Sequence, residues 1–283
     1  MKALDNIVRR IAGADGLDAV ATPLGKVISR LVQPTTVRNL LSGTWLGHAV
    51  HPVLTDLPIG AWSMATLLDL AGGEDAQPAA DLLVGVGVLT AVPTAATGLH
   101  DWSDTMGAES RVGVVHAGAN VAALGLYAGS LVARRASHRR RGTWLGLAGL
   151  AALTVGGYLG GHLAYANAVN VNHTAFEHRP DHWTSVLAET ELAEGQPRQV
   201  VTGDAAILLV RDGGQVHALA NRCSHLGGPL NEGEIVEGCV QCPWHGSVFR
   251  LRDGHIVRGP ASAPQPTYDV RVQAGQIEVR ARA

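Results

Sequence analysis

Charged and aromatic residues are scarce in this sequence. Of its 283 residues, 16% are charged and 4% are aromatic, only two are Phe, and the mean hydropathy is positive. Soluble globular domains carry about 25% charged residues. The composition is therefore not that of an ordinary soluble protein.

Several functional motifs are also missing. The chain has no glycine-rich phosphate-binding motif, no convincing flavin or nicotinamide fingerprint, and no basic, aromatic-rich surface of the kind that binds nucleic acid. The first residues do not combine a basic region, an apolar region and a cleavage site, so we expect no cleavable signal peptide. These absences argue against nucleotide cofactors and nucleic-acid partners.

Long apolar segments account for the composition. Four of them are near the length of about 20 largely apolar residues that a membrane-spanning helix needs. Three of the four contain no Asp, Glu, Lys or Arg. They are residues 51–70, 82–99, 112–133 and 143–161. We predict an all-α, four-helix transmembrane bundle. A soluble Ala/Gly-rich bundle stays open, because Asp56 and Asp69 lie within the first segment.

A shorter amphipathic segment precedes these four. In "LGKVISRLV", residues 24–32, the apolar side chains form one helical stripe with Lys26 and Arg30 outside it. Such a helix could lie on a membrane surface or pack in the ordinary way against other helices.

Histidines mark the ends of the predicted spans. In an up-and-down bundle, the starts of the first and third helices share one face with the ends of the second and fourth. The histidines on that face are His48, His51, His100, His116 and His162. Inward histidines at matching depth are how membrane cytochromes hold haem b. We predict His51 and His116 as axial ligands, with His100 and His162 as the second choice. Interfacial histidines bonded to Asp56 and Asp101 are the simpler alternative.

The C-terminal third has a different pattern. Short β-branched runs alternate with glycine-rich turns, which predicts a small all-β domain. Within it, the ligand types and spacing C-x-H-x16-C-x2-H are supplied by Cys223, His225, Cys242 and His245. Two Cys and two His suit tetrahedral zinc, and they equally suit a [2Fe-2S] cluster with one Cys-bound and one His-bound iron. Each half of the pattern mixes Cys with His, which favours the cluster.

The stretch "CSHLGGPL…CPWHGSVFRLRDGHIVRGPA" resembles a Rieske domain, and the match runs from about Trp183 to the C-terminus. The resemblance implies that Cys223 and Cys242 hold the inner iron, and that His225 and His245 hold the outer iron near solvent. It also implies that "GPASAPQP", residues 259–266, forms a loop over the cluster.

Departures from the family pattern bear on the redox potential. Gly228 and Trp244 occupy positions where high-potential members carry a disulfide. Ser247 is kept as a hydroxyl donor, but Phe249 replaces a frequent Tyr. We therefore expect a potential in the lower or middle part of the roughly −150 to +300 mV Rieske range. The third cysteine, Cys239, is expected to be an ordinary strand thiol.

The apolar half resembles an uncharacterised family of four-helix membrane proteins, through "HPVLTDLPIGAWSMATLLDL", "TGLHDW", "VVHAGAN" and "GGHLAY", over residues 40–170. We divide the chain into a tail (1–45), a transmembrane domain (46–165), a linker (166–183) and a Rieske domain (184–283). In the linker, Asn170, His173 and His178 have a spacing similar to an oxygenase iron site, but we interpret the segment as a polar hinge.

Four crossings place the N-terminus and the Rieske domain on one side of the plasma membrane. The five-arginine loop "ARRASHRRRG" favours the cytoplasm for its own side and the extracytoplasmic side for the cluster. The basic N-terminal tail argues the other way.

We predict a membrane-anchored one-electron carrier that exchanges with a redox partner protein or a quinone. One alternative is an enzyme module that oxidises quinol, with His225 or His245 accepting the proton. A second is a ferredoxin component that feeds a separate oxygenase or oxidoreductase. A third is a zinc-containing membrane adaptor.

Overall fold

A computed structural model describes residues 2–282 of the chain. The chain forms two compact units, and each is built from two separate stretches of sequence. Unit 1 contains the residues up to Gln33 together with Val50–Val169. Unit 2 contains Pro34–Ala49 together with the chain from Asn170 onward. The predicted tail, residues 1–45, is thus divided between the two units.

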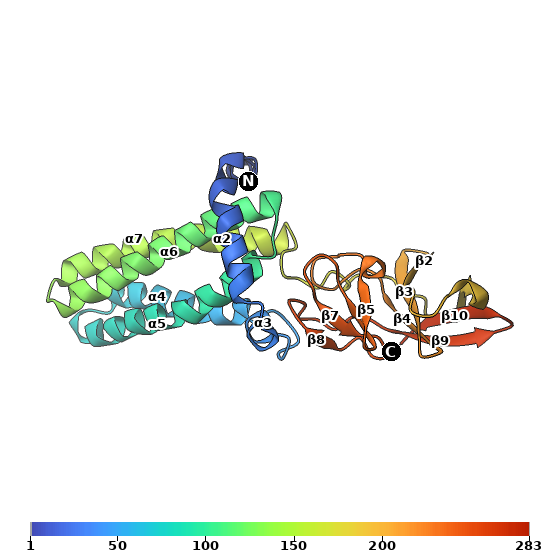
Figure 1. Cartoon of the computed structure of the whole chain (residues 1–283). Coiled ribbons are helices and arrows are strands. Elements are labelled where there is room, and N and C mark those ends of the chain that lie inside the picture. Colours follow the sequence, from blue (N-terminus) through green and yellow to red (C-terminus); the bar gives the residue numbers. More distant parts are fainter. Residues whose placement is uncertain (1, 283) are drawn as a thin grey trace. The chain divides into compact units, whose positions relative to one another are not determined.

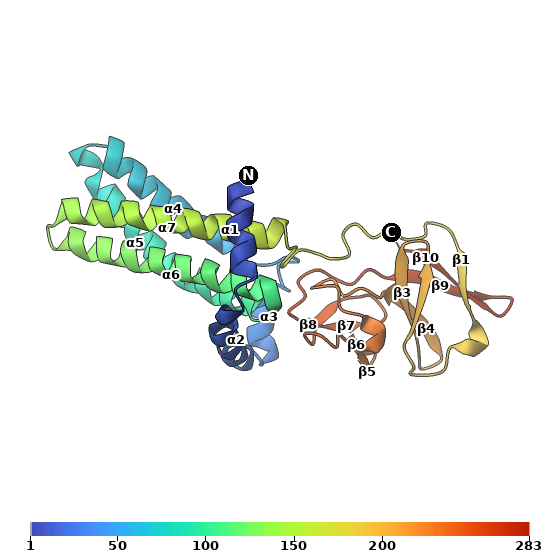
Figure 2. The same cartoon turned by 90° about the horizontal axis from the view of Figure 1, so that it is seen from above.

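Unit 1 is helical, and four long helices form most of it (Figures 1 and 2). They are α4 (His51–Ala71), α5 (Gln77–Trp102), α6 (Gly107–Arg135) and α7 (Arg139–Tyr165). Proline in the first turn of α4 and of α5 suits helix starts, where the backbone N–H has no helical partner. Helices α4 and α5 form one antiparallel hairpin and α6 and α7 another, and the hairpins meet through α5 with α6 and α4 with α7.

Aromatic stacking joins the two hairpins at the centre of unit 1. The ring of Trp62 on α4 stacks on that of Tyr127 on α6, with 4.3 Å between centroids and 7° between planes. Glycines make room for both rings, since a Cβ at Gly87 or Gly149 would overlap Trp62 or Tyr127. With few aromatics in the chain, this single pair supplies much of the interior bulk.

Buried ion pairs join all four long helices near the end of α4, the start of α5, the end of α6 and the start of α7. The side chains of Arg134 and Asp69 are 1% and 4% exposed, and they are ion-paired. Arg134 also pairs with Asp81 at 2.9 Å, and Arg139 bonds both carboxylates. Charges this buried are stable only in mutual contact. Asp69, which weakened the prediction of a membrane span, is therefore neutralised within the unit.

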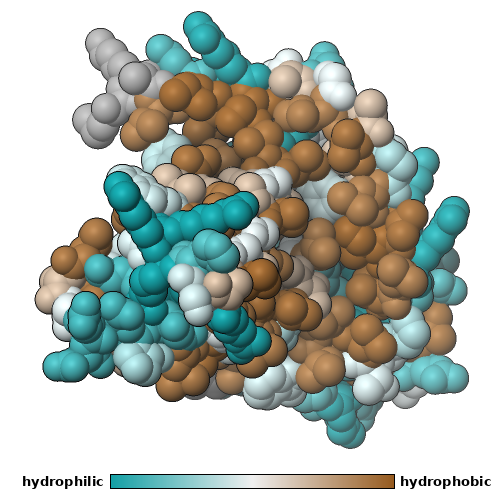
Figure 3. All heavy atoms as spheres, turned by 90° about the vertical axis from the view of Figure 1, so that its left-hand side faces the viewer, coloured by the Kyte–Doolittle hydropathy of each residue, from teal (hydrophilic) through white to brown (hydrophobic). Residues whose placement is uncertain are grey.

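Three helical segments are long and apolar enough to cross a membrane: Glu74–Trp102, Gly107–Arg135 and Arg139–Tyr165. In the 18-residue apolar stretch of each helix, only 28%, 22% and 28% is buried within the structure, respectively. Apolar side chains such as Leu82, Leu89, Val121 and Val132 face outward, and brown atoms cover much of the face in Figure 3. Helix α4 is not among these three segments, and it carries two aspartates and two prolines. The predicted four-helix transmembrane bundle is therefore not shown: the described residues form a helical region in which three helices are apolar enough to cross a membrane.

The N-terminal part of unit 1 forms α1 (Lys2–Ala12) and α2 (Asp18–Leu31). Val8 packs with Val112 and Leu159 of the long helices. Along α2, Ile28 is buried whereas Val27 is half exposed. The amphipathic segment is therefore helical, and only part of its apolar stripe is packed.

Unit 2 consists of short antiparallel strands in three sheets. The first sheet contains β1 (Thr184–Ala188), β10 (Gln276–Ala281) and β9 (Tyr268–Gln273). The second contains β2 (Arg198–Thr202), β3 (Ala205–Asp212) and β4 (Gln215–Ala220). The third contains β5 (Glu234–Val236), β6 (Cys239–Gln241), β7 (Val248–Arg250) and β8 (Ile256–Arg258). These strands confirm the all-β domain.

Two apolar cores stabilise unit 2. One lies between the first two sheets and includes Ile207, Leu209 and Ile277. The other includes Phe249 and Val240 of the third sheet together with Cys223 and Cys242. The two cysteines are thus part of a packed core, so the loops that follow them start from fixed points. Unit 2 also contains the short helix α3 (Thr35–Ser42), which contacts β8.

Candidate metal centre

Two loops at one end of the third sheet carry the four predicted ligands. The first ligand loop, residues 221–229, follows β4 and contains Cys223 and His225. The second, residues 242–247, joins β6 to β7 and contains Cys242 and His245. The structure brings the two cysteines together and the two histidines together, although 16 residues separate the two halves of the pattern.

The two ligand loops have the same backbone design. In the first, Cys223 N donates to Gly228 O at 2.9 Å and Gly227 N donates to Cys223 O at 2.9 Å. In the second, Cys242 N donates to Ser247 O at 2.8 Å and Gly246 N donates to Cys242 O at 3.0 Å. The glycine four residues after each cysteine has a positive φ, 76° and 70°. Only glycine adopts that conformation readily, so this repeated glycine is a sequence signal that the ligand spacing alone did not reveal.

Each cysteine sulfur is buried and faces the other. Cys223 is 1% exposed and Cys242 2% exposed, and both are free thiols, as is Cys239. The backbone N–H groups of His225 and Leu226 point at the Cys223 sulfur, and those of Trp244 and His245 at the Cys242 sulfur. The facing thiol lowers the pKa of Cys242 to about 7 and raises that of Cys223. Four N–H donors around two sulfurs suit bound thiolates.

The two imidazole rings lie edge to face, with 5.0 Å between centroids and 84° between planes. His245 is partly exposed, as expected for a ligand near solvent. His225 is 5% exposed and is not near solvent. The linker covers its loop, because His173 N donates to Ser224 O at 3.0 Å. The backbone of His173 is thus bound to the first ligand loop.

A third segment, residues 259–266, crosses both ligand loops. Ser224 Oγ donates to Ala263 O at 2.7 Å, and Ala261 N donates to Ser247 Oγ at 3.0 Å. Gln265 is 2% exposed, and its amide bonds Ser224 N and the carbonyls of Ala220 and Arg222. This cover loop lies where the resemblance implied, and Ser247 is partly occupied in anchoring it.

The four side chains fit a binuclear cluster better than a single ion. Over residues 2–282, no group of three or more His, Cys, Asp or Glu side chains converges on a point where one metal ion could be held. Tetrahedral zinc needs four ligands that converge in that way. A sulfur pair and an imidazole pair instead offer two ligands to each of two irons. Gly228 completes the cradle, because a Cβ there would lie 2.9 Å from Cys242 Sγ.

The histidines of unit 1 form a second candidate site. His51 Nδ1 lies 3.0 Å from Thr94 O of α5, and His116 Nδ1 lies 2.8 Å from Gly156 O of α7. A carbonyl only accepts, so both rings carry hydrogen on Nδ1 and keep the Nε2 lone pair. The two rings lie near enough to interact electrostatically. Asn120 Nδ2 lies 3.3 Å from His116 Nε2.

These two histidines occupy equivalent places in the two hairpins. A Cβ at Gly98 would lie 2.6 Å from the His51 ring, and a Cβ at Gly160 would lie 2.9 Å from the His116 ring. In both cases the glycine follows the residue of the carbonyl by four positions. The glycine and the carbonyl residue therefore lie on the same side of their helix. Each imidazole is thus held by one carbonyl and given room by one glycine of the neighbouring helix.

The other histidines have different surroundings. His100, the second choice, is 1% exposed and bonds Asp101 at 3.2 Å through Nδ1. His162 is half buried near the end of α7. His48 belongs to unit 2 and is exposed, with Nδ1 2.9 Å from Ala49 O. Of the five histidines predicted to share one face, only His51 and His116 have matching surroundings among the described residues.

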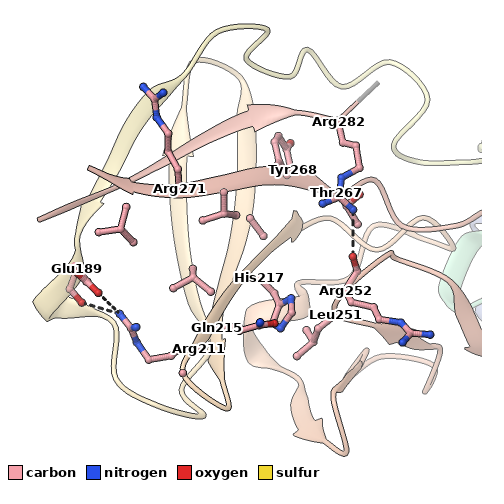
Figure 4. Close-up of a pocket in the computed structure, with 15 residues that line it drawn as sticks. Glu189, Arg211, Gln215, His217, Leu251, Arg252, Thr267, Tyr268, Arg271 and Arg282 are labelled. Carbon is pink, nitrogen blue, oxygen red and sulfur yellow. Dashed lines mark hydrogen bonds and ion pairs between the residues drawn. The ribbon is translucent and has the colours of Figure 1, made fainter. Parts of the chain in front are cut away.

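A pocket of about 460 Å³ in unit 2 is lined by strands β3, β4 and β9 and by residues near the C-terminus (Figure 4). Its cations are already neutralised, since Arg211 contacts Glu189, Arg271 contacts Glu278 and Arg282 contacts Asp269. None of the four predicted ligands lines this pocket. We therefore assign no role in the metal centre to it.

Comparison with known proteins divides the chain in a similar way. The family model of the Rieske [2Fe-2S] domain matches residues 182–269, and that of a predicted membrane protein, DUF2231, matches residues 47–173. The chain is 36% identical over 91 residues to apoptosis-inducing factor 3 of Mus musculus, which covers 32% of this chain but only 15% of that protein.

Smaller proteins match over nearly their whole length. The anthranilate 1,2-dioxygenase ferredoxin subunit of Burkholderia cepacia is 34% identical over 97 residues, which are 34% of this chain and 90% of that subunit. Among solved structures, the ferredoxin of carbazole 1,9a-dioxygenase from Nocardioides aromaticivorans is 30% identical, with 35% of this chain and 98% of that one covered and a TM-score of 0.34.

Proposed function

Because this chain belongs to the Rieske [2Fe-2S] family, we propose that it is a membrane-anchored one-electron carrier of the ferredoxin type. A relative that the chain covers almost completely is a ferredoxin subunit of a dioxygenase. A separate oxygenase or oxidoreductase is accordingly the partner class that we favour over direct oxidation of quinol. The protein would then pass electrons to an enzyme and would not itself be one.

The paired loops carry this proposal. Cys223 and Cys242 would hold one iron, and His225 and His245 the other. When bound, the cluster supplies reversible one-electron transfer. The backbone N–H groups of both loops stabilise negative charge on the sulfurs, and the core around Phe249 excludes water from them. His245 and the 53% exposed Trp244 provide the accessible edge at which a partner could approach.

The test is low-temperature EPR of the detergent-purified, dithionite-reduced protein, with iron and acid-labile sulfide measured on the same sample. We expect a Rieske signal with two irons and two sulfides per chain. Cys242→Ser and His245→Ala should each abolish the signal, whereas Cys239→Ser, which changes the half-buried thiol of β6, should preserve it. A colourless protein that contains one zinc would contradict the proposal.

Anchoring through unit 1 is supported by its three long apolar helices, whose outer surfaces are largely unpacked. We infer that α4 crosses together with them. Its 21 residues span about 31 Å, which matches a hydrocarbon core of about 30 Å. Asp69 is neutralised by Arg134, and α4 pairs with α5 along the same hairpin.

A second redox group in unit 1 is favoured by the equivalent placement of His51 and His116. Both imidazoles have Nδ1 bonded to a carbonyl, and the amide of Asn120 lies within reach of His116 Nε2. Such a pair is suited to ligate haem b through Nε2, with His116 turning from Asn120, or to hydrogen-bond a quinone. The visible spectrum of the same preparation separates these candidates. Haem would give Soret and α bands that are lost in His51→Ala and His116→Ala and kept in His138→Ala, which alters an exposed loop histidine. Absence of these bands would leave quinone binding as the candidate.

A further inference from the structure

Helix α3 packs against unit 2 through a buried arginine. The side chain of Arg38 is 3% exposed. Its Nε donates to Gly259 O at 3.1 Å, and its Nη2 donates to His245 O at 3.1 Å. Burying a guanidinium is costly unless its donors are satisfied. Here two of the acceptors are backbone carbonyls of the second ligand loop and of the cover loop.

The next residue, Asn39, also joins α3 to the backbone around Gly259. Gly259 N donates to Asn39 Oδ1 at 2.8 Å, and Asn39 Nδ2 donates to Val257 O at 3.2 Å. The amide therefore pairs with the backbone at the end of β8 as a neighbouring strand would. Gly259 permits the close approach, because a Cβ there would lie 2.7 Å from Ser42 Oγ.

These contacts join the second ligand loop to the cover loop, two segments that are separate in the sequence. His245 is a predicted ligand of the outer iron, and Gly259 begins the cover loop. A guanidinium presents its N–H groups in a rigid planar fork, so one Arg38 side chain fixes the spacing between both carbonyls. The fork also places a permanent positive charge next to the backbone of His245.

We propose that Arg38 is a positioning residue of the cluster. It holds the loop of His245 against the cover loop, and its charge raises the midpoint potential. Reduction adds one negative charge to the cluster, and a nearby positive charge stabilises that state. The inference rests on the [2Fe-2S] assignment, but not on the identity of the electron donor or acceptor.

The test compares Arg38→Gln, Arg38→Lys and the control Arg198→Gln in the full-length protein. Arg198 is exposed on β2, and its replacement changes the net charge of the same unit equally. Midpoint potential, EPR g values and the rate of iron loss to a chelator are measured. For Arg38→Gln we expect a reduction equilibrium weakened roughly tenfold, which is about 59 mV for one electron, shifted g values, and iron loss several times faster. The control should match the wild type.

The lysine variant separates charge from geometry. It keeps the charge but replaces the planar fork by a flexible ammonium that does not fix the spacing of the two carbonyls, so its potential should remain near the wild-type value while iron loss is as fast as in Arg38→Gln. Unchanged g values, potential and iron retention in Arg38→Gln would overturn the role of Arg38 alone. A wild-type protein without a Rieske signal would instead overturn the proposed function.

Asn39→Ala keeps the test decisive if both Arg38 variants fail to accumulate. It removes the paired contacts at Val257 and Gly259 without changing charge. We expect faster iron loss with the potential close to that of the wild type. Iron loss at the wild-type rate would show that the contacts of Asn39 do not hold the cover loop.

Discussion

Two side chains beside the cysteines determine how many hydroxyl donors can reach the cluster. Phe249 is fully buried in the core that contains Cys223 and Cys242. Ser247 is also fully buried, and its Oγ accepts from Ala261 N, so its own hydrogen can go to a further acceptor. Donors to cluster sulfurs stabilise the reduced form.

We therefore expect Phe249→Tyr to raise the midpoint potential and Ser247→Ala to lower it. Both shifts should be small beside the roughly 450 mV that Rieske centres span. Redox titration followed by EPR measures them, and Phe249→Leu serves as a packing control without a hydroxyl. A potential near +300 mV in the wild type would contradict the expected lower or middle range.

Glu177 offers a test of pH dependence in unit 2. Burial raises the pKa of its carboxyl above the usual value, and one carboxylate oxygen has no hydrogen-bond partner in the structure. A carboxyl whose pKa is raised in the folded state stabilises the fold below the unfolded pKa, and this contribution is lost as pH rises through the folded pKa. The ionised group therefore destabilises unit 2 at neutral pH.

Glu177→Gln should stabilise the protein at pH 7 by about 1 kcal/mol and leave it unchanged near pH 4. Thermal unfolding of the cluster-loaded protein at both pH values measures the difference. Glu191→Gln, which changes an exposed residue in the same unit, is the control. Equal stabilisation at both pH values would exclude a titration effect.

At the residue scale, the four ligands could be proposed from the sequence because each Cys and His pair lies within one loop. The structure brings the two cysteines together and the two histidines together. Arg38 could not be identified, because 207 residues separate it from His245 and 221 from Gly259. Nothing about one arginine in a short helix distinguishes it from a solvent-exposed one.

At the scale of elements, each of the four apolar segments lies within one long helix, and the predicted ends differ from the observed ends by up to five residues. The observed helices are longer, because polar end residues such as Arg134 and Arg139 are helical too. Asp69 argued against a membrane span because it places a charge within the first apolar segment. Its pairing with arginines from α6 and α7 was not predictable, since it depends on how the hairpins assemble.

Removing one member of this buried ion-pair network should be costly. Asp69→Asn leaves Arg134 and Arg139 with a weakened partner, and loss of a buried pair costs about 3–5 kcal/mol. Thermal unfolding in detergent should show the loss, while Asp75→Asn in the exposed connection between α4 and α5 should not. If both variants unfold like the wild type, the network does not stabilise unit 1.

At the scale of the whole molecule, the arginine-rich connection between α6 and α7 predicts orientation. Arg134 and Arg139 are committed to ion pairs, and Arg135, Arg140 and Arg141 remain exposed. Positive charge in short loops favours the cytoplasm. With an even number of crossings, unit 2 would lie on the extracytoplasmic side.

Protease protection measures that orientation. In intact cells we expect added protease to digest unit 2, with the same fragment pattern after permeabilisation. Digestion only after permeabilisation would place unit 2 in the cytoplasm. It would then attribute the orientation to the basic N-terminal tail, whose six basic residues also favour that side.

The divided construction of unit 2 also sets an order of synthesis. Residues 34–49 leave the ribosome first, and residues 50–169 must follow before any strand of the same unit exists. The backbone carbonyls that Arg38 contacts, those of His245 and Gly259, are therefore synthesised only after the long helices. Unit 2 can accordingly be completed only after its last strands have been synthesised.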